Sequence, residues 1–394
     1  MEEWKEYRLI DVLDALIDYR GKTPKKTAFG VPLITAKIIK NGRIETPSEF
    51  ISLNDYDSWM VRGFPKVGDV VLTTEAPLGE VAQLDDANIA LAQRVVTLRG
   101  KSGVLDNTYL KYYFLSNVGH QRLKARETGT TVTGIKQSEL REVIVDVPPY
   151  EIQVRISNIL KSLDDKIEVN RKINENLEQQ AQALFKSWFV DFEPFKNGEF
   201  VESELGMIPK GWRVGKLGEI CNVFTGKKDV KQSQPKGLYP FFSCSPNHTY
   251  SNEYIYDGPS IIIAGNGSYT GRTSFYFGKF DLYQRTYACT IKEGFNEKII
   301  SFLYYMMKCL FEPVKMGGTR GSSIPYIVMN DIVLQKFALD NSLVEKYSDF
   351  AYNVMKQIQQ NNQESRRLAE LRDTLLPKLM SGELNVFGKP DDQS

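Results

Sequence analysis

Apolar residues recur at intervals of three and four in two long segments of this chain. The first segment begins after Pro148 and Pro149, and the second runs toward Pro377. Kept over about four heptads, this spacing predicts two long helices joined along a coiled-coil seam. The predicted seam positions are Ile156, Ile159, Leu163, Ile167, Asn170, Leu177 and Leu184 in the first helix, and Tyr347, Phe350, Val354, Ile358, Asn361, Leu368 and Leu375 in the second.

Two asparagines interrupt the apolar pattern at equivalent places. A buried asparagine costs stability unless it meets a polar partner, so Asn170 and Asn361 would penalise slipped registers of the seam. The alternative is that each faces solvent on a curved helix. Pro377 is expected to end the second helix or to kink its last turn, and Gly382 is a plausible C-cap residue.

The second half of the chain repeats the first. Tyr347 lies 191 residues after Ile156, and every later seam position keeps that offset. A repeat of this length indicates duplicated structural units. Segments before the helices repeat as well: Trp4 returns as Trp212, Gln93-Arg94 as Gln284-Arg285, Tyr112-Tyr113 as Tyr304-Tyr305, and Gly129-Thr130 as Gly318-Thr319.

The order of elements is therefore globular unit, long helix, globular unit, long helix. We predict an α+β protein with two repeated α/β domains, separated by a long antiparallel two-helix coiled coil and related by a pseudo-twofold axis. The expected boundaries are 1–150 for the first domain, 151–195 for the central helix, 196–340 for the second domain, 341–385 for the C-terminal helix and 386–394 for a flexible tail.

Composition adds few constraints. With 42% hydrophobic and 25% charged residues the chain resembles an ordinary soluble globular protein. Its first residues alternate in charge and do not form a signal peptide, and it has no apolar stretch of about eighteen residues, so we expect a cytoplasmic protein. The four cysteines form no Cys-x-x-Cys pair and only two histidines are present, so we expect reduced thiols and no metal site.

Positive charge is concentrated locally although the net charge is only +1. The segment from Arg20 to Arg43 contains seven basic residues and no acidic residue. A solvated loop would explain this run, but a basic patch is also what a nucleic-acid surface requires.

Four motifs resemble the specificity subunits of type I restriction–modification enzymes. Ile208-Pro209-Lys210-Gly211-Trp212-Arg213 resembles the start of a target recognition domain of that family. The segment 184–194, Leu-Phe-Lys-Ser-Trp-Phe-Val-Asp-Phe-Glu-Pro, looks like the end of its central conserved helix. The segment 371–383 is similar to its C-terminal conserved segment, and Arg20-Gly21-Lys22-Thr23-Pro24 resembles a turn near the start of a recognition domain.

The resemblance implies a function for each part. Each globular unit would be a target recognition domain that reads one half of an asymmetric, bipartite double-stranded DNA site. The helices would bind two methyltransferase subunits, which carry S-adenosylmethionine and methylate adenine, and restriction (motor) subunits would join the complex. This chain itself would hold no cofactor.

Catalytic motifs of the common types are missing. Asp146-Val147-Pro148-Pro149 is similar to an amino-methyltransferase loop, but Val147 stands where that chemistry needs a polar residue. Ala264-Gly265-Asn266-Gly267 follows an apolar strand, yet Thr270 replaces the third glycine of a dinucleotide fingerprint, so a hairpin turn is expected. We therefore predict a non-catalytic subunit.

Lysine and arginine would contact phosphates, and side chains that reach base edges would give specificity. The candidates for DNA contact are Arg20, Lys22, Thr23, Lys25, Lys26, Lys37 and Arg43 in the first unit, and Lys227, Lys228, Lys231, Asn247, His248, Asn266, Tyr269, Arg272 and Arg320 in the second. The repeated Gln-Arg pairs are interpreted as structural residues of a turn. Phe185, Trp188, Phe189 and Leu376 are candidates for docking the methyltransferase, with burial against this chain's own domains as the alternative.

Two other interpretations stay open. The chain could be the specificity subunit of a related methylation-based defence system, or a coiled-coil scaffold whose domains bind protein. A stand-alone methyltransferase lacks support because its cofactor loop is missing. Salt-sensitive DNA binding together with a methyltransferase separates the first of these from the scaffold.

Overall fold

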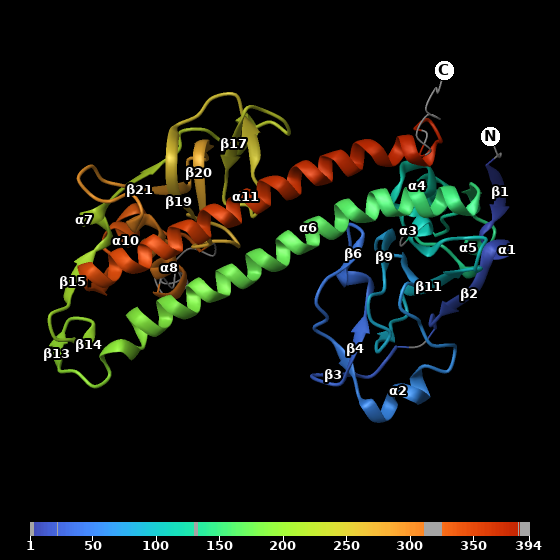
Figure 1. Ribbon diagram of the computed structural model, residues 1–394, viewed down its shortest axis with the longest axis horizontal. Helices are drawn as coiled ribbons and strands as arrows, with labels where there is room; N and C mark the ends of the chain where they lie inside the picture. Colours follow the sequence, from blue (N-terminus) through green and yellow to red (C-terminus); the bar gives the residue numbers. More distant parts are fainter. Residues whose placement is uncertain (1–3, 22, 130–132, 311–324, 385, 387–394) are drawn as a thin grey trace, which may run out of the picture. The chain divides into compact units, whose positions relative to one another are not determined.

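A computed structural model describes residues 4–21, 23–129, 133–310, 325–384 and 386. The chain divides into two compact units. Unit 1 comprises Met1–Ile167 and Arg366–Ser394, and unit 2 comprises Glu168–Ser365. Two long helices, α6 (Tyr150–Phe185) and α11 (Asn341–Met380), contribute to both units (Figure 1).

Unit 1 is built around an antiparallel sheet of order β2-β11-β8-β9. Its inner strand β8 has the sequence Val-Val-Leu-Thr-Thr and is buried throughout, as expected for a β-branched run inside a sheet. A second sheet has the order β10-β4-β7-β3. The strands are β1 (Lys5–Arg8), β2 (Leu13–Asp18), β3 (Lys26–Thr27), β4 (Val31–Ile34), β5 (Ile39–Lys40), β6 (Arg43–Ile44), β7 (Phe50–Ile51), β8 (Val70–Thr74), β9 (Leu78–Gln83), β10 (Ala90–Leu91), β11 (Val95–Gly100) and β12 (Ile144–Val147).

Helix α3 covers the sheet of unit 1 and forms much of its core. The carboxylate of Asp106 accepts a hydrogen bond from the backbone N–H of Tyr109 at 2.7 Å, which starts the helix with an N-cap. Buried aromatic residues then face β8, β9 and β11. The helices of unit 1 are α1 (Leu9–Val12), η1 (Ala36–Ile38), α2 (Leu53–Trp59), α3 (Asn107–Leu115), α4 (Asn117–Lys124) and α5 (Gln137–Arg141).

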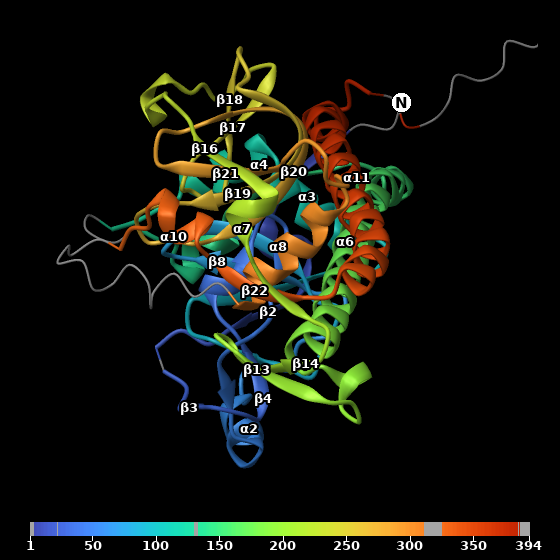
Figure 2. The same ribbon diagram turned by 90° about the vertical axis from the view of Figure 1, so that its left-hand side faces the viewer.

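Unit 2 contains a six-stranded sheet of order β16-β21-β19-β20-β17-β18. Helix α8 lies against β19, β20 and β21, and Figure 2 shows it beside this sheet. The strands are β13 (Phe200–Ser203), β14 (Gly206–Pro209), β15 (Arg213–Lys216), β16 (Cys221–Thr225), β17 (Tyr239–Phe242), β18 (Thr249–Ser251), β19 (Tyr256–Ala264), β20 (Thr273–Leu282), β21 (Thr286–Ile291) and β22 (Lys336–Leu339). The helices are η2 (Lys186–Val190), η3 (Glu193–Phe195), α7 (Leu217–Ile220), η4 (Val230–Gln232), α8 (Ile299–Leu310) and α10 (Met329–Val333).

The strand registers show the duplication predicted from the sequence. In unit 1, β8 pairs antiparallel with β11, with Thr73 opposite Val95. In unit 2, β19 pairs antiparallel with β21, with Ala264 opposite Thr286. Both members of the second pair lie 191 residues after their counterparts. The antiparallel pair β1–β12 of unit 1 also returns as β15–β22 in unit 2, although with other offsets. The predicted two-domain α/β fold with long helices is therefore confirmed.

The two long helices run antiparallel within each unit. In unit 2, Tyr347 donates its hydroxyl to the carbonyl of Ala181 at 2.9 Å, whereas Asn361 donates to Asn174 at 2.7 Å. Asn170 and Asn361 are buried, with 1% and 7% exposure, and the amide of Asn170 donates to Glu364 at 2.7 Å. Both asparagines therefore have the polar partners that a buried position requires.

Two predicted seam residues face outward. Ile159 is 37% exposed and Phe350 is 39% exposed, and the adjacent Leu160 and Ala351 are buried instead. The sequence allowed either choice because residues three and four apart both lie near one helix face. The domains that pack on the helices select the buried face, so these two assignments are corrected.

The segment from Phe185, the last residue of α6, to Phe189 in η2 also differs from the expectation of a docking surface. Phe185 and Phe189 are 0% and 4% exposed. The centroid of the Phe189 ring lies 4.8 Å from that of Phe302 and 5.5 Å from that of Tyr347. These two phenylalanines belong to the core of unit 2 and cannot bind a partner protein. Trp188 and Leu376 are only partly buried against the cores of their own units.

Helix α11 continues through Pro377 to Met380, so this proline does not end it. Gly382 follows with φ 73, the left-handed conformation of a C-cap glycine. None of the helices in the described ranges combines the length with the apolar character that crossing a membrane would need.

Candidate nucleic-acid interface

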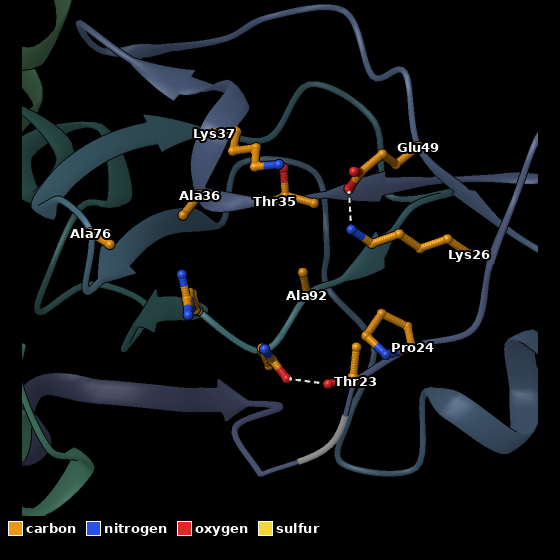
Figure 3. A pocket seen from close by; sticks show the side chains of 11 residues that line it. Thr23, Pro24, Lys26, Thr35, Ala36, Lys37, Glu49, Ala76 and Ala92 are labelled. Carbon is orange, nitrogen blue, oxygen red and sulfur yellow. Dashed lines mark hydrogen bonds and ion pairs between the residues drawn. The ribbon is translucent and has the colours of Figure 1, made fainter. Parts of the chain in front are cut away.

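Three of the predicted DNA contacts of unit 1 lie together around a hollow of about 300 Å³ (Figure 3). Thr23, Lys26 and Lys37 come from the loop after β2, from β3 and from η1. The turn after β8 and the turn before β11 also line the hollow. The lining residues are Thr23, Pro24, Lys26, Thr35, Ala36, Lys37, Glu49, Ala76, Ala92, Gln93 and Arg94.

Polar contacts around the hollow are weak enough to be exchanged for a ligand. Lys26 forms an ion pair with Glu49 at 2.8 Å, and Thr23 donates its hydroxyl to Gln93 at 2.9 Å. The Lys26 side chain is 47% exposed. The Glu49 side chain is 30% exposed, so the ion pair is partly solvated and contributes about 1 kcal/mol. The lysine can therefore turn toward a phosphate at a cost of that order.

The other basic candidates of unit 1 fall into two groups. Lys25 and Arg43 are exposed, with their charges available to a polyanion. Arg20 is held by this chain: its guanidinium contacts Asp18 at 2.5 Å and the carbonyl of Ile135 at 2.5 Å. A DNA contact by Arg20 would have to replace both bonds. Lys22 lies outside the described residues.

The DNA-contact candidates of unit 2 also differ in how exposed they are. Lys227, Lys231, Asn247 and Tyr269 are exposed, whereas Asn266 is half-buried. The ring of the half-buried His248 lies 5.5 Å from that of Phe242 and 5.4 Å from that of Tyr250. Arg320 is not among the described residues.

Two cationic side chains of unit 2, Lys228 and Arg272, form contacts within the protein. Lys228 contacts Asp281 at 2.6 Å and Glu253 at 2.8 Å. Burial opposes the charge of Lys228, but these carboxylates outweigh it and raise its pKa. Arg272 donates to the carbonyl of Ser245 at 2.5 Å, and burial lowers its pKa. Arg20, Lys228 and Arg272 are thus the weakest members of the predicted DNA-contact set.

Residues not chosen from the sequence also border these loops. Arg94 lines the hollow of unit 1, and its Nε lies 2.7 Å from the carboxylate of Glu75. Its counterpart Arg285 is exposed in unit 2. The repetition of the Gln-Arg pair in both halves is the sequence signal that marks these two arginines. The predicted structural role of the pair holds for the backbone, because the carbonyls of Arg94 and Arg285 accept the N–H groups of Thr74 and Gly265. Both arginine side chains are nevertheless exposed.

The two motifs that were similar to catalytic loops are parts of ordinary elements. Val147 ends strand β12 opposite Lys5, and α6 begins three residues later. Ala264-Gly265-Asn266-Gly267 leads from β19 into a connection to the antiparallel strand β20, as expected for a hairpin. The described part of the chain contains no group of three histidine, cysteine or acidic side chains arranged for a metal ion.

Comparison with known families decides what these domains are. The family described as "Type I restriction modification DNA specificity domain" matches residues 1–179 and 209–339, one range in each half of the chain. The chain belongs to this family. The specificity subunit of the type I restriction enzyme MjaIX of Methanocaldococcus jannaschii is 29% identical, over 98% of this chain and 94% of the relative.

Other specificity subunits are also similar to this chain over nearly its whole length. The HindI specificity subunit of Haemophilus influenzae is 28% identical and is matched over its whole length, with 98% of this chain covered. The crystal structure of a type I specificity subunit from M. genitalium has the same fold, with a TM-score of 0.58, 18% identity and 96% of each chain covered. The relatives are specificity subunits, which agrees with the expectation of a non-catalytic subunit.

Proposed function

We propose that the two units of this specificity subunit each read one half of a bipartite, asymmetric DNA site. The observation that carries the proposal is the duplication: one family domain occurs twice, on the same strand register. A duplicated scaffold whose loops differ suits two targets of different sequence. The predicted domain boundaries at 150, 195, 340 and 385 serve as the working definition of the two target recognition domains.

The basic residues at the loops would supply affinity, and polar loop residues would supply specificity. Lysines such as Lys26 and Lys37 neutralise phosphates and release counterions, which is independent of sequence. Base edges in the major groove are read by bidentate groups such as arginine, asparagine or glutamine. The hollow of unit 1 provides both kinds of side chain on one surface.

The assembled enzyme would supply the chemistry. Two methyltransferase subunits with bound S-adenosylmethionine would methylate adenine at the selected site, and restriction subunits would add translocation and cleavage. The complex would act in the cytoplasm, on double-stranded DNA.

Equivalent exposed residues indicate where two copies of one partner would dock. Ile159 in unit 1 and Phe350 in unit 2 hold the same repeat position, and each exposes more than a third of a large apolar side chain. Two identical partners need two equivalent surfaces. We therefore transfer the docking role from the buried Phe185 and Phe189 to these two residues.

Co-purification with the methyltransferase tests the docking surface. Ile159→Asp and Phe350→Asp should each reduce the ratio of methyltransferase to this chain from two to one, and the double variant should bind none, because charge at an apolar contact is costly. Leu53→Asp, at a residue 73% exposed on α2, is the control and should keep two copies. A double variant that still binds two copies contradicts the assignment.

Salt dependence tests DNA reading itself. Binding of the methyltransferase complex to its target should weaken linearly in a plot of log affinity against log salt, by about 0.9 for each phosphate neutralised. Lys37→Gln should reduce the slope by about one. Lys172→Gln, an exposed residue of α6, should leave it unchanged. DNA affinity that does not respond to salt would contradict the proposal.

A further inference from the structure

The turn that follows β8 in unit 1 is fixed by a small set of backbone bonds. The N–H of Thr74 donates to the carbonyl of Arg94 at 3.0 Å, and the N–H of Ile135 donates to the carbonyl of Thr74 at 2.9 Å. The next residue, Glu75, forms an antiparallel bridge with Gly134. These bonds hold the backbone of Glu75 between two other segments of unit 1.

The turn that follows β19 in unit 2 has the same bonds. The N–H of Gly265 donates to the carbonyl of Arg285 at 2.9 Å, and the N–H of Ile327 donates to the carbonyl of Gly265 at 2.9 Å. Asn266 forms an antiparallel bridge with Tyr326. Asn266 therefore occupies in unit 2 the place that Glu75 occupies in unit 1.

The residue after each of these positions confirms the equivalence. Ala76 has φ 50 and Gly267 has φ 82, so both turns pass through the left-handed region at the same point. Ala76 also lines the hollow that contains Lys26 and Lys37. The turn of unit 1 thus lies at the candidate DNA surface.

The two turns carry different side chains at the bridged position and the same Gln-Arg pair beside it. The carboxylate of Glu75 accepts hydrogen bonds, whereas the carboxamide of Asn266 both donates and accepts. Next to them, Arg94 and Arg285 are identical. Two domains that read different sequences share their contacts to the DNA backbone and differ in their contacts to bases.

We infer that Glu75 and Asn266 are the base-reading residues of this duplicated turn, and that Arg94 and Arg285 are its phosphate contacts. The inference rests on the proposed function, since it needs each unit to bind DNA. Glutamate suits the amino group of cytosine, and asparagine suits adenine.

The side chains of Glu75, Arg94 and Asn266 form weak contacts within the protein, and contacts to DNA can replace them. Arg94 and Glu75 form an ion pair with 50% and 36% exposed side chains, which solvent already weakens. The Asn266 carboxamide oxygen accepts from the thiol of Cys244 at 3.0 Å, and a thiol is a weak donor. Each reading group is held in place by its backbone and only lightly by its side chain.

Mapping of adenine methylation in cells that express the full chain with its methyltransferase tests the inference. Glu75→Gln and Asn266→Asp should each change the preference at one position of one half-site, by about five- to a hundredfold, and leave the other half-site unchanged. Arg94→Gln and Arg285→Gln should lower methylation at all target sites without changing the sequence recognised. Ser268→Ala, an exposed neighbour of Asn266, is the matched control.

The outcomes separate this inference from the function on which it rests. Unchanged base preference in both Glu75→Gln and Asn266→Asp, with methylation intact, overturns the inference and leaves the bipartite reading standing. A wild-type chain that directs no methylation to a bipartite site overturns the proposed function. Melting temperatures show whether each variant is folded, and Asn266→Ser replaces Asn266→Asp if that variant melts early.

Discussion

A half-buried carboxylate, Asp164 on α6, joins three side chains of unit 1. It accepts hydrogen bonds from the hydroxyl of Tyr112 at 2.6 Å and from Arg372 at 2.7 Å, and it pairs with Lys111 at 3.2 Å. Burial lowers the pKa of Lys111, which is only 7% exposed. The carboxylate is therefore the counter-charge that lets a lysine remain inside unit 1.

Asp164→Asn should destabilise unit 1 by about 3 kcal/mol or more, because it leaves Lys111 buried without a counter-charge. Chemical denaturation of the full chain measures the change. The adjacent Asp165→Asn is the control: Asp165 is 59% exposed and pairs with Lys161 one helical turn away, so it should change stability by about 0.5 kcal/mol or less. Equal effects of the two variants would contradict this role.

The stability difference between wild type and Asp164→Asn should depend on acid pH. Burial alone would raise the pKa of Asp164, but Lys111, Tyr112 and Arg372 outweigh it and hold the pKa below its ordinary value of 3.8. A depressed pKa contributes stability above the unfolded value that is lost as pH falls through the folded value. The difference should stay constant near neutral pH and shrink below pH 3.8. A difference that persists unchanged below that pH would contradict this pairing.

At the scale of elements, the aromatic residues of η2, which follows α6, stabilise unit 2. Phe189→Ala should destabilise unit 2 by about 3–5 kcal/mol, because the cavity would open against Phe302 and Tyr347. Phe295→Ala is the matched control, since Phe295 is 44% exposed and should cost about 1 kcal/mol or less. Denaturation curves distinguish the two. A small effect of Phe189→Ala would mean that its ring is not part of the core.

The sequence predicted the elements better than their contacts. Periodicity located α6 and α11, and the 191-residue offset anticipated the repeated strand register, because both depend on local pattern. It could not decide between Ile159 and Leu160 as the buried residue, since the packed domain makes that choice. Nor could it show that Lys228 is paired with Asp281, 53 residues away. Residue type predicted which side chains can bind phosphate, but only tertiary structure shows which of them are already engaged.

At the scale of the whole molecule, α6 and α11 are the elements that both units share. We predict that inserting one heptad after Ile167 and one after Ser365, the points at which the units divide, lengthens each helix by about 10 Å. The DNA spacer should then grow by about three base pairs, while both half-sites stay the same. Methylation mapping reads the spacer directly. An altered half-site with an unchanged spacer would show that the helices do not set the separation.

The central claim is that two duplicated domains read two separate DNA sequences. Long-read mapping of adenine methylation in cells that express the wild-type chain with its methyltransferase tests it most directly. The account predicts one motif, made of two short defined blocks of different sequence separated by a spacer of fixed length and any sequence. A continuous motif, or two identical blocks, would contradict it.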